Sequence, residues 1–254
     1  MARYFIHLSY CGTAYNGWQN QPHSGTKTIQ GTIESVLSLL LRSEISIVGC
    51  GRTDTGVHAS GYVAHLDTET IFDPEQLIYR ANKLLPSDIA IHHIYPVDRS
   101  MHARFGAVSR SYQYHLHVVK SPFLPFSYYY VYEKPDIFKL NEAASLLLAY
   151  KEFFPFCKLH SDVKTMVCHL KESYWIQEGD NYIYKVTSDR FLRGMIRLIV
   201  GMCLQVSRGQ LSIDDVKLSL DTQARLHQDW SVPAIGLMLY DIRYESFPHN
   251  LSED

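Results

Sequence analysis

The order in which strand-like and helix-like segments follow one another restricts the fold more than any other feature of this sequence. Alternating polar and apolar side chains predict strands, and apolar residues spaced by three and four predict helices. In the first half the order is strand, helix, strand, strand, helix, strand, which is the ferredoxin-like unit. The predicted segments are, in turn, 3 to 9, 28 to 42, 45 to 50, 62 to 66, 74 to 85 and 89 to 97.

The second half repeats this order. Apolar positions from Leu192 to Cys203 predict a long helix that ends before Gly209. We therefore expect an α+β fold of two ferredoxin-like βαββαβ halves with antiparallel sheets. The remaining predicted segments are strands at 108 to 119, 166 to 176, 182 to 186 and 236 to 244, with a helix at 140 to 150.

The boundary between the halves is expected within residues 98 to 105. This gives an N-terminal domain of residues 1–103, which carries the candidate catalytic aspartate, and a C-terminal domain of residues 104–254. The segment lacks the Gly/Ser-rich composition of a flexible linker. We therefore expect a rigid pair of domains with a cleft between them.

Composition narrows the class of protein. A chain of 254 residues with 46% hydrophobic content is long enough to bury a sizeable core. Its five cysteines are an odd set without a Cys-x-x-Cys pair, which argues against a disulfide framework and a thiolate metal site. No segment approaches the length of an apolar membrane span. A soluble, cytoplasmic protein without a membrane partner is expected.

The charge balance argues against a nucleic-acid partner when it is taken alone. There are 24 Lys plus Arg against 26 Asp plus Glu, for a net charge of -2. Many nucleic-acid binders show a basic excess. Phosphate attraction depends, however, on where the cations lie, so local clusters have to supply the argument.

One short run carries the chemistry: Gly51-Arg52-Thr53-Asp54-Thr55-Gly56-Val57-His58-Ala59. Its carboxylate lies two residues from an arginine, between glycines that permit sharp turns. The structural alternative is a turn in which Asp54 binds neighbouring backbone amides. A phosphate-binding loop would continue with lysine, which is absent, and a glycoside hydrolase would need two carboxylates. Nucleotide and glycoside hydrolysis are therefore disfavoured.

Read as a whole, the run resembles the active-site segment of the tRNA pseudouridine synthase A family, Gly-Arg-Thr-Asp-Ala-Gly-Val-His-Ala, at eight of nine positions. The departures are Thr55 for alanine, Cys11 for a frequent aspartate and Gly194 for a frequent histidine, and 160 to 180 gives no match. Further blocks resemble the family in order: Tyr10-Cys11-Gly12-Thr13, Gly17-Trp18-Gln19, Met101-His102-Ala103-Arg104-Phe105, Ser111-Tyr112, Phe191-Leu192-Arg193, Met195-Ile196-Arg197, Ile199-Val200-Gly201, Pro233-Ala234 and Gly236-Leu237.

The resemblance implies the pseudouridine synthase fold with a central active-site cleft. It also implies a homodimer that isomerises uridine to pseudouridine in the anticodon stem-loop of tRNA, at positions 38 to 40, without a cofactor. In this family the N-glycosidic bond breaks and the uracil rejoins the sugar through carbon. Asp54 matches the family's nucleophile. Attack on the sugar, attack on the base and a glycal route all stay open, and each needs an ionised carboxylate.

Three further roles follow from the resemblance. Arg52 matches the residue that fills the space left by the extruded base, Tyr112 the tyrosine that stacks on uracil, and Arg197 the arginine that pairs with the catalytic carboxylate. Without the resemblance, Arg52 would be interpreted as a solvated surface arginine, Tyr112 as a core tyrosine and Arg197 as part of a solvated helix face. Because the target base is stacked or paired, some residue must stabilise its extruded position.

The predicted RNA contacts lie around these residues. On the expected long helix Arg193 and Arg197 are four residues apart, hence on one side, with Arg190 three before Arg193. His58 could act as a general base, and His115 and His117, on alternate strand positions, could hold a metal. A structural histidine is favoured for each, and without a third ligand at suitable spacing no metal is predicted. The RNA-binding or base-flipping candidates are Arg52, His58, Arg104, Arg110, Arg190 and Arg193, with Lys185 as a further cation.

A competing hypothesis is a tRNA-binding or tRNA-folding protein without catalysis. It would use the same basic residues and need no nucleophile. The intact Asp54 argues against it.

Overall fold

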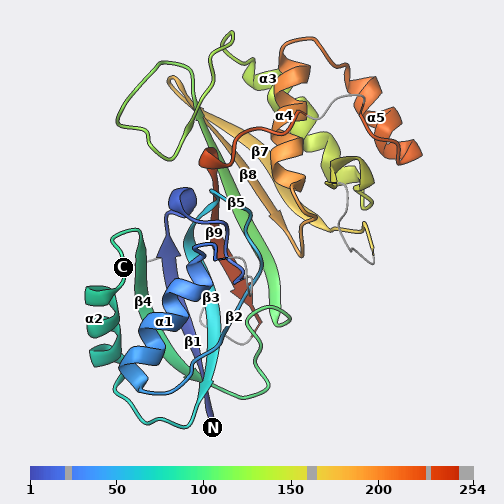
Figure 1. The fold of residues 1–254 in the computed structure, drawn as a ribbon. Helices are drawn as coiled ribbons and strands as arrows, with labels where there is room; N and C mark the ends of the chain where they lie inside the picture. The colour runs from blue at the N-terminus through green and yellow to red at the C-terminus, as the bar shows by residue number, and fades with distance from the viewer. Residues whose placement is uncertain (21–24, 159–164, 227–229, 246–254) are drawn as a thin grey trace. The chain divides into compact units, whose positions relative to one another are not determined.

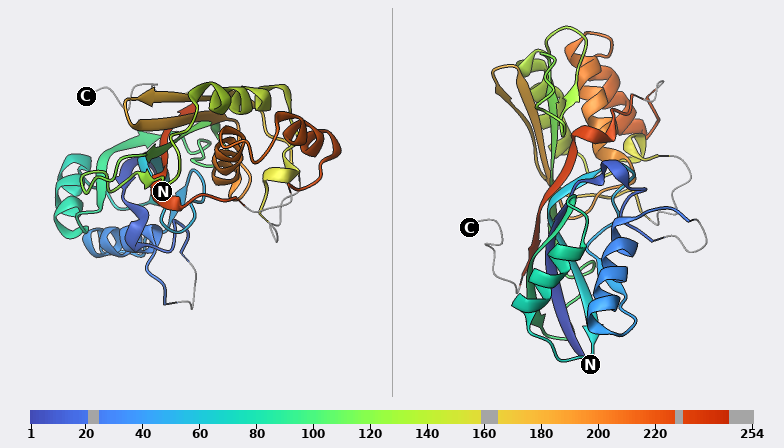
Figure 2. Two further views of the ribbon diagram at one scale, coloured as in Figure 1. Left: turned by 90° about the horizontal axis from the view of Figure 1, so that it is seen from above. Right: turned by 60° about the vertical axis from the view of Figure 1, so that its left-hand side comes forward.

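The structure consists of two compact units. It is a computed structural model that describes residues 1–20, 25–158, 165–226 and 230–245. Unit 1 comprises Met1–Val108 and Met238–Asp254, and unit 2 comprises Ser109–Leu237. Each unit combines strands with helices, as the ribbon views show (Figures 1 and 2).

The sheet of unit 1 is built around its first strand. β1 (Ala2–Tyr10) pairs antiparallel with β3 (His58–Thr68) on one side and with β4 (Ile89–Val97) on the other. The opposite edge of β3 is shared by β2 (Ile47–Gly49), which is antiparallel, and β9 (Leu237–Tyr244), which is parallel. β9 pairs with the first two residues of β3 and so fixes the point where the preceding loop ends.

Both helices of unit 1 begin at side-chain caps. The Thr28 hydroxyl accepts a hydrogen bond from the Gly31 N–H and caps α1 (Ile29–Leu41). Asp73 caps α2 (Pro74–Leu84), whose first residue is a proline that needs no hydrogen-bond acceptor. The two helices contact each other, and α2 packs on β4 (Figure 1).

The sheet of unit 2 has β8 (Asn181–Ser188) at its centre. β8 pairs antiparallel with β5 (Ala107–His117) on one side and with β7 (Leu170–Glu178) on the other. The two-residue strand β6 (Tyr128–Tyr129) pairs in parallel with the end of β5. The first two residues of β5 belong to unit 1.

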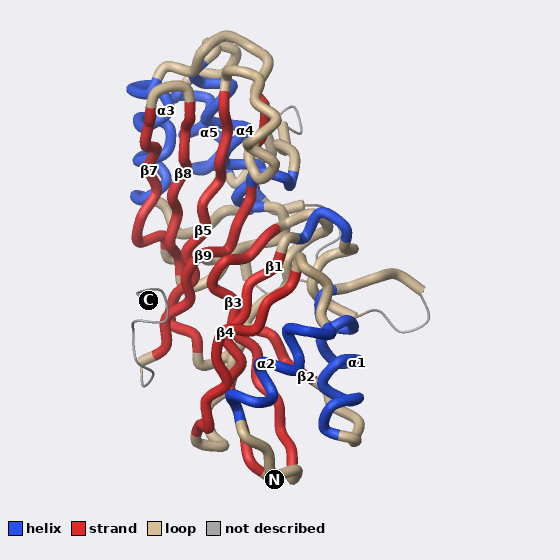
Figure 3. Tube along the Cα trace, turned by 90° about the vertical axis from the view of Figure 1, so that its left-hand side faces the viewer, coloured by secondary structure: helices blue, strands red, loops and turns tan. Residues whose placement is uncertain are grey.

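Three helices belong to unit 2: α3 (Ile137–Leu146), α4 (Met195–Ser207) and α5 (Ile213–Thr222). α3 contacts both α4 and β7, so these helices lie over one face of the strands (Figure 3). Short 3-10 helices complete the described elements of both units: Gly12–Ala14, Leu147–Ala149, Phe154–Phe156 and Ala234–Gly236.

Buried side-chain hydrogen bonds fix α3 on β7. The Asn141 amide donates to the Trp175 carbonyl at 3.1 Å and accepts from its N–H at 2.8 Å. The Ser173 hydroxyl donates to the Ala144 carbonyl and lies 2.8 Å from the Tyr184 hydroxyl. Tyr184 is fully buried, and this burial raises the pKa of its phenol. These side-chain-to-backbone hydrogen bonds tie the helix to the strand at two points, which keeps the helix in one register.

The predicted α+β fold class with mostly antiparallel strands is confirmed. β3 begins at His58, four residues earlier than expected, because residues 58–59 pair with β9. Among the described strands and α-helices, β6 and α5 were not predicted. α5 does carry a local signal, a capping box between Ser212 and Asp215.

The predicted domains, residues 1–103 and 104–254, differ from the compact units at the last strand. β9 from Met238 onward belongs with unit 1, since it pairs with β3. Such pairing of distant segments leaves no trace in local periodicity, and the domain boundary stays a prediction. Among the described residues, no helix has the length and apolar character needed to cross a membrane.

Two buried histidines make unit 1 sensitive to acid. Burial lowers the pKa of His7 to about 4, with a further contribution from His92 and His93. Burial also lowers the pKa of His65 to about 4, with a further contribution from the Arg3 charge. Histidine in an unfolded chain titrates near 6.5, so the unfolded chain binds these protons first. The stability is fully present above about pH 6.5 and is lost as the pH falls toward 4.

We expect the melting temperature to fall between pH 7 and pH 5, and the variant His65→Asn to lessen that fall. An asparagine oxygen in place of Nδ1 can still accept the Ala103 N–H, which lies 3.2 Å from that atom, but it does not bind a proton in this range. Thermal unfolding of both proteins across this pH range measures the effect. An identical pH dependence in the two proteins would contradict this assignment.

Candidate active site

The loop between β2 and β3 contains the motif, and three hydrogen bonds hold its first half. The Tyr62 hydroxyl donates to the Gly51 carbonyl. The Tyr10 hydroxyl lies 2.8 Å from Thr53 Oγ1, and the Trp18 N–H donates to the Thr53 carbonyl at 3.2 Å. The backbone on both sides of residue 52 is therefore fixed.

Three aromatic rings form the base on which this loop rests. Trp18 and Tyr62 stack with ring centroids 4.0 Å apart, and Tyr10 packs against both at 6.0 and 5.5 Å. Each of the three side chains is at most 4% exposed. Because two of them also supply hydroxyl groups to the loop, burial of the rings and placement of the loop depend on each other.

Neither Arg52 nor Asp54 has a fully buried side chain. Arg52 is exposed, and its Nε donates to Gln19 Oε1 at 3.2 Å. Gln19 is held in turn by Gln30 of α1, at 2.9 Å. Asp54 is half-buried, its carbonyl accepts the Val57 N–H, and within the described residues of unit 1 its carboxylate accepts no hydrogen bond. The carboxylate thus does not bind neighbouring backbone amides, as the structural alternative for Asp54 required.

The loop also touches the segment that follows β1. Gly17 has a φ of +83°, and a Cβ at this position would lie 2.4 Å from the Thr53 carbonyl oxygen and 3.2 Å from the Asp54 carbonyl carbon. Only glycine fits here without moving the loop. The position of Asp54 is therefore linked to a residue 37 places earlier in the chain.

His58 is part of this support. It is 3% exposed, and its Nδ1 accepts the Gly12 N–H at 3.1 Å. A ring nitrogen that accepts carries no proton, so the Gly12 contact requires the neutral ring. Direct contact between this ring and RNA would require its exposure, and the geometry is that of a structural histidine.

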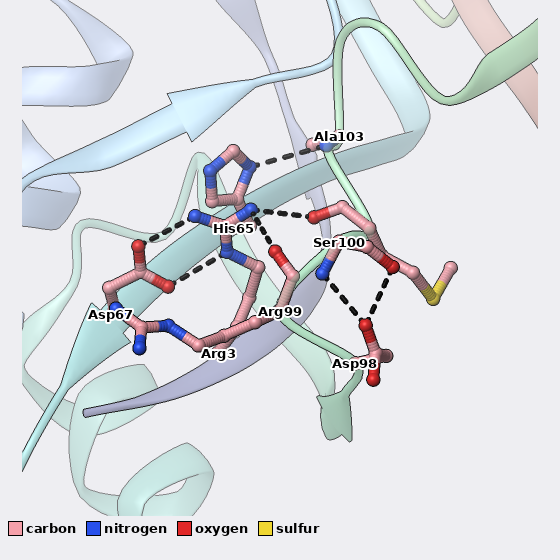
Figure 4. Close-up of polar contacts among 8 residues, drawn as sticks. Arg3, His65, Asp67, Asp98, Arg99, Ser100 and Ala103 are labelled. Atoms are coloured by element: carbon pink, nitrogen blue, oxygen red, sulfur yellow. Dashed lines mark hydrogen bonds and ion pairs between the residues drawn. The ribbon is translucent and has the colours of Figure 1, made fainter.

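Arg104 lies elsewhere in unit 1, in the segment that follows β4. Its side chain is exposed, and its backbone N–H donates to His102 Nδ1. The carbonyl of Met101 in this segment accepts a hydrogen bond from Arg3, which also binds Asp67 (Figure 4). The segment that contains Arg104 is thus held by hydrogen bonds separate from those of the Asp54 loop.

In unit 2, Tyr112 lies on β5, one pleat before the buried Tyr114. Its half-exposed ring meets the Phe191 ring edge-on, with centroids 5.2 Å apart. The Arg110 guanidinium donates to the Asp189 carbonyl at 2.7 Å. The start of β5 and the segment 189 to 191 are thus joined at two points, one at Arg110 and one at Tyr112.

Asp189 holds that segment in place. Its carboxylate accepts the backbone N–H groups of His169 and Arg190, lies 2.8 Å from the His169 ring Nδ1, and accepts the Ser188 hydroxyl. Burial raises the pKa of Asp189, but these hydrogen bonds outweigh it and keep the pKa below its ordinary value. This role of Asp189 was not predicted, because it depends on contacts that form only in the folded chain.

The helical row of arginines predicted for this region is wrong. α4 begins only at Met195, and residues 193 and 194 form a turn in which Gly194 is left-handed with a φ of 71°. Arg190 and Arg193 therefore lie outside the helix and do not share a face with Arg197. Arg193 is exposed, and its carbonyl accepts the Lys158 N–H.

Arg197 lies in the first turn of α4 and anchors the segment before β9. Its Nε donates to the Val232 carbonyl at 2.6 Å, and its carbonyl accepts the Val232 N–H at 3.3 Å. The next carbonyl, that of Pro233, accepts the Tyr114 hydroxyl at 2.9 Å. Within the described residues of unit 2, the two terminal nitrogens of Arg197 have no hydrogen-bond acceptor.

The segment before β9 also packs closely against the backbone of α4. A Cβ at Gly201 of α4 would lie 1.9 Å from the Trp230 carbonyl oxygen, so only glycine permits this approach. The segment from 230 to 236 is thus fixed by α4 and β5 together.

The histidines of β5 hold other polar groups. His115 Nε2 lies 3.0 Å from Gln113 Oε1, and His117 Nδ1 lies 2.9 Å from the Ser127 hydroxyl. Burial lowers the pKa of both rings. In the part of the chain that the structure describes, no group of three or more His, Cys, Asp or Glu side chains is placed to hold a metal ion.

Comparison with known proteins gives one consistent match. A family model described as tRNA pseudouridine synthase matches residues 6–106 and 143–245. A Parabacteroides distasonis protein named tRNA pseudouridine synthase A is 44% identical over 254 residues, 98% of this chain and 99% of the relative. Proteins of that name from Porphyromonas gingivalis and Bacillus subtilis are 43% and 35% identical, over 97% and 94% of this chain and 98% of each relative.

The close approach at Gly17 yields a stability prediction. Gly17→Ala adds a left-handed strain of about 1 kcal/mol and a clash with Thr53, so we expect a loss of about 3 kcal/mol or more. Gly25→Ala is the matched control, because Gly25 also has a positive φ, of 64°, but a Cβ there meets no atom within 4 Å. Urea unfolding of both variants measures the difference, and equal losses would show that the Thr53 contact is unimportant.

Proposed function

This chain belongs to the tRNA pseudouridine synthase family, and we propose that it converts uridines of the tRNA anticodon stem-loop with Asp54 as its nucleophile. The family catalyses an isomerisation of uridine, so the enzyme class is an isomerase. The assignment of the nucleophile to Asp54 is supported by the structure of the loop around it. The loop is fixed on both sides of Arg52 by buried rings, while the carboxylate has no structural hydrogen bond in unit 1.

The reaction exchanges one bond for another on the same two partners. The bond from the ribose C1′ to N1 of uracil breaks, the base turns, and a bond from C1′ to C5 forms. The hydrogen on C5 is lost and N1 gains one, so atoms and electrons balance without an added reactant. An ionised carboxylate serves each of the open routes, as nucleophile toward the sugar or the base or as support for a glycal.

Tyr112 and Arg197 of unit 2 complete the proposed catalytic set. A tyrosine ring at the half-exposed position of Tyr112 suits stacking on uracil, and its hydroxyl can take part in proton transfer at C5. Arg197 uses Nε to hold Val232, which fixes the plane of its guanidinium. Its terminal nitrogens are then pre-oriented for a bidentate bond to a carboxylate, which we propose is Asp54.

The other arginines are proposed to bind RNA. Arg52, next to Asp54 in the loop, is proposed to occupy the space that the extruded uridine leaves. The candidate phosphate contacts are Arg104, Arg110, Arg190 and Arg193. A homodimer and a cytoplasmic location also belong to this proposal, and both rest on the resemblance to the family.

Replacement of Asp54 tests the nucleophile. We expect Asp54→Asn to form no detectable pseudouridine in unmodified tRNA, as assayed by chemical mapping, because the amide is not nucleophilic. Since the carboxylate has no hydrogen bond in unit 1, stability should change by less than about 0.5 kcal/mol.

Thr55→Ala is the matched control for that experiment. The residue is an exposed neighbour in the same loop, and alanine is the usual family residue there, so activity should stay at the wild-type level. Wild-type protein that binds tRNA but leaves every uridine unchanged would overturn the enzymatic proposal in favour of a binding protein.

Two arginines on either side of the start of α4 should separate catalysis from binding. Arg197→Lys keeps the charge but cannot hold Val232 and also offer two parallel donors, so we expect kcat to fall about 100-fold with little change in KM. Arg193→Ala removes an exposed charge, so KM should rise and the salt dependence of binding should weaken by about one unit of slope. An unchanged kcat for Arg197→Lys would contradict its catalytic role.

A further inference from the structure

An exposed phenylalanine lies at the tip of a turn in unit 1. Phe105 is 78% exposed, while Ala103, two residues earlier, is fully buried. A single exposed apolar side chain is common and needs no explanation by itself. Phe105 differs because the structure holds its backbone firmly and places a cation and an imidazole beside its ring.

The turn is closed by hydrogen bonds to one residue. The carbonyl of His102 accepts the Gly106 N–H at 2.8 Å. Nδ1 of the same histidine accepts the N–H groups of Arg104 and Phe105, at 3.1 and 3.2 Å. Both residues that project from the turn are thus oriented by the ring of His102.

Two hydrogen bonds attach this turn to the sheet of unit 1. The Ala103 N–H donates to the buried His65 Nδ1 on β3, and the Ala103 carbonyl accepts the Tyr244 hydroxyl of β9 at 2.6 Å. Neither strand is free to move independently, because β9 pairs with β3. The backbone of the turn therefore has a rigid attachment directly before Phe105.

A second attachment lies on the preceding residues. Arg3 of β1 binds both carboxylate oxygens of Asp67, at 2.8 and 2.7 Å. Its remaining terminal nitrogen donates to the carbonyls of Arg99 and Met101, at 3.0 and 2.8 Å (Figure 4). The hydrogen bond from Arg3 keeps the pKa of Asp67 below its ordinary value, so this clamp stays charged near neutral pH.

The surroundings of the Phe105 ring are those of a stacking site. The His102 ring lies 4.5 Å from it, centroid to centroid, and the Arg104 guanidinium lies 5.6 Å from its centroid. Aromatic rings and guanidinium planes are the groups on which proteins stack unpaired bases of RNA. The Arg104 side chain is exposed, so a phosphate can approach its guanidinium.

We propose that Phe105 is a base-stacking residue that receives an unpaired nucleobase of the RNA substrate, with Arg104 contacting the adjacent phosphate. This rests on the proposed function for the nature of the RNA and adds a recognition residue outside the Asp54 loop. The base covers an apolar ring that is otherwise open to water, and the rigid turn means that little conformational freedom is lost on binding.

The experiment measures equilibrium binding of an unmodified tRNA transcript to protein that carries Asp54→Asn, so that no turnover occurs. Phe105→Ala should weaken binding about 5-fold to 150-fold, the range for the loss of one base stack. Phe105→Tyr should bind within about twofold of the parent, because a flat aromatic face is kept. Phe105→Leu should bind as weakly as the alanine variant, because it keeps apolar bulk without that face.

The salt dependence distinguishes stacking from charge. Phe105→Ala should leave the slope of binding against salt concentration unchanged, whereas Arg104→Gln should reduce it by about one. Phe123→Ala is the matched control, because Phe123 is 87% exposed and lies outside any proposed RNA contact. It should bind tRNA like the parent.

The outcomes separate this inference from the proposed function. Alanine and leucine variants that bind within twofold of the parent overturn the stacking role even if the wild-type enzyme forms pseudouridine. A leucine variant that binds like the parent while the alanine variant does not would show that apolar bulk suffices without an aromatic face, and it also overturns the stacking role. Conversely, the expected pattern in a protein that forms no pseudouridine supports stacking while the proposed activity fails. Absence of tRNA binding by the parent protein overturns both.

Discussion

The contact between the backbone at Gly17 and the backbone at Thr53 is the constraint on which the candidate site in unit 1 depends. The two segments approach so closely that no Cβ fits between them. The N–H of the next residue, Trp18, donates a hydrogen bond to the Thr53 carbonyl. A contact between two backbones cannot be adjusted by a change of rotamer. The Trp18 and Tyr62 rings stack on each other and the Tyr62 hydroxyl binds the Gly51 carbonyl, so ring packing and hydrogen bonding together hold the loop that carries Asp54.

Unit 2 also depends on a close approach between two backbones at a glycine. The segment that precedes β9 lies against Gly201, where its backbone takes the space of a side chain, and Arg197 and Tyr114 bind consecutive carbonyls of it. An arginine with Nε committed in this way loses little further entropy when it binds a carboxylate, because its fork is already oriented. Structural use of one nitrogen and proposed catalytic use of the other two therefore support each other.

Local signals predicted the elements of this fold well where the signal itself is local. The caps at Thr28 and Asp73 and the periodic apolar residues of α1 define their helices without tertiary contacts. The start of α4 was misplaced because Leu192 continues the helical spacing, although a buried leucine fits a turn as well as a helix. The site was found through the resemblance of its motif. The supporting role of Tyr62 is invisible in a chain with 18 tyrosines, since it depends on contacts 11 residues away in a folded loop.

The formal charge of -2 still has to be reconciled with an RNA substrate. Arg3 is neutralised by Asp67, so this cation adds little to the field that attracts phosphates. The side chains of Arg52, Arg104 and Arg193 are exposed to solvent, where they can meet phosphates. Few phosphate contacts give a small electrostatic contribution to affinity. Shape and base stacking must then supply a larger share, and a rigidly held, solvent-exposed aromatic ring such as Phe105 meets that requirement.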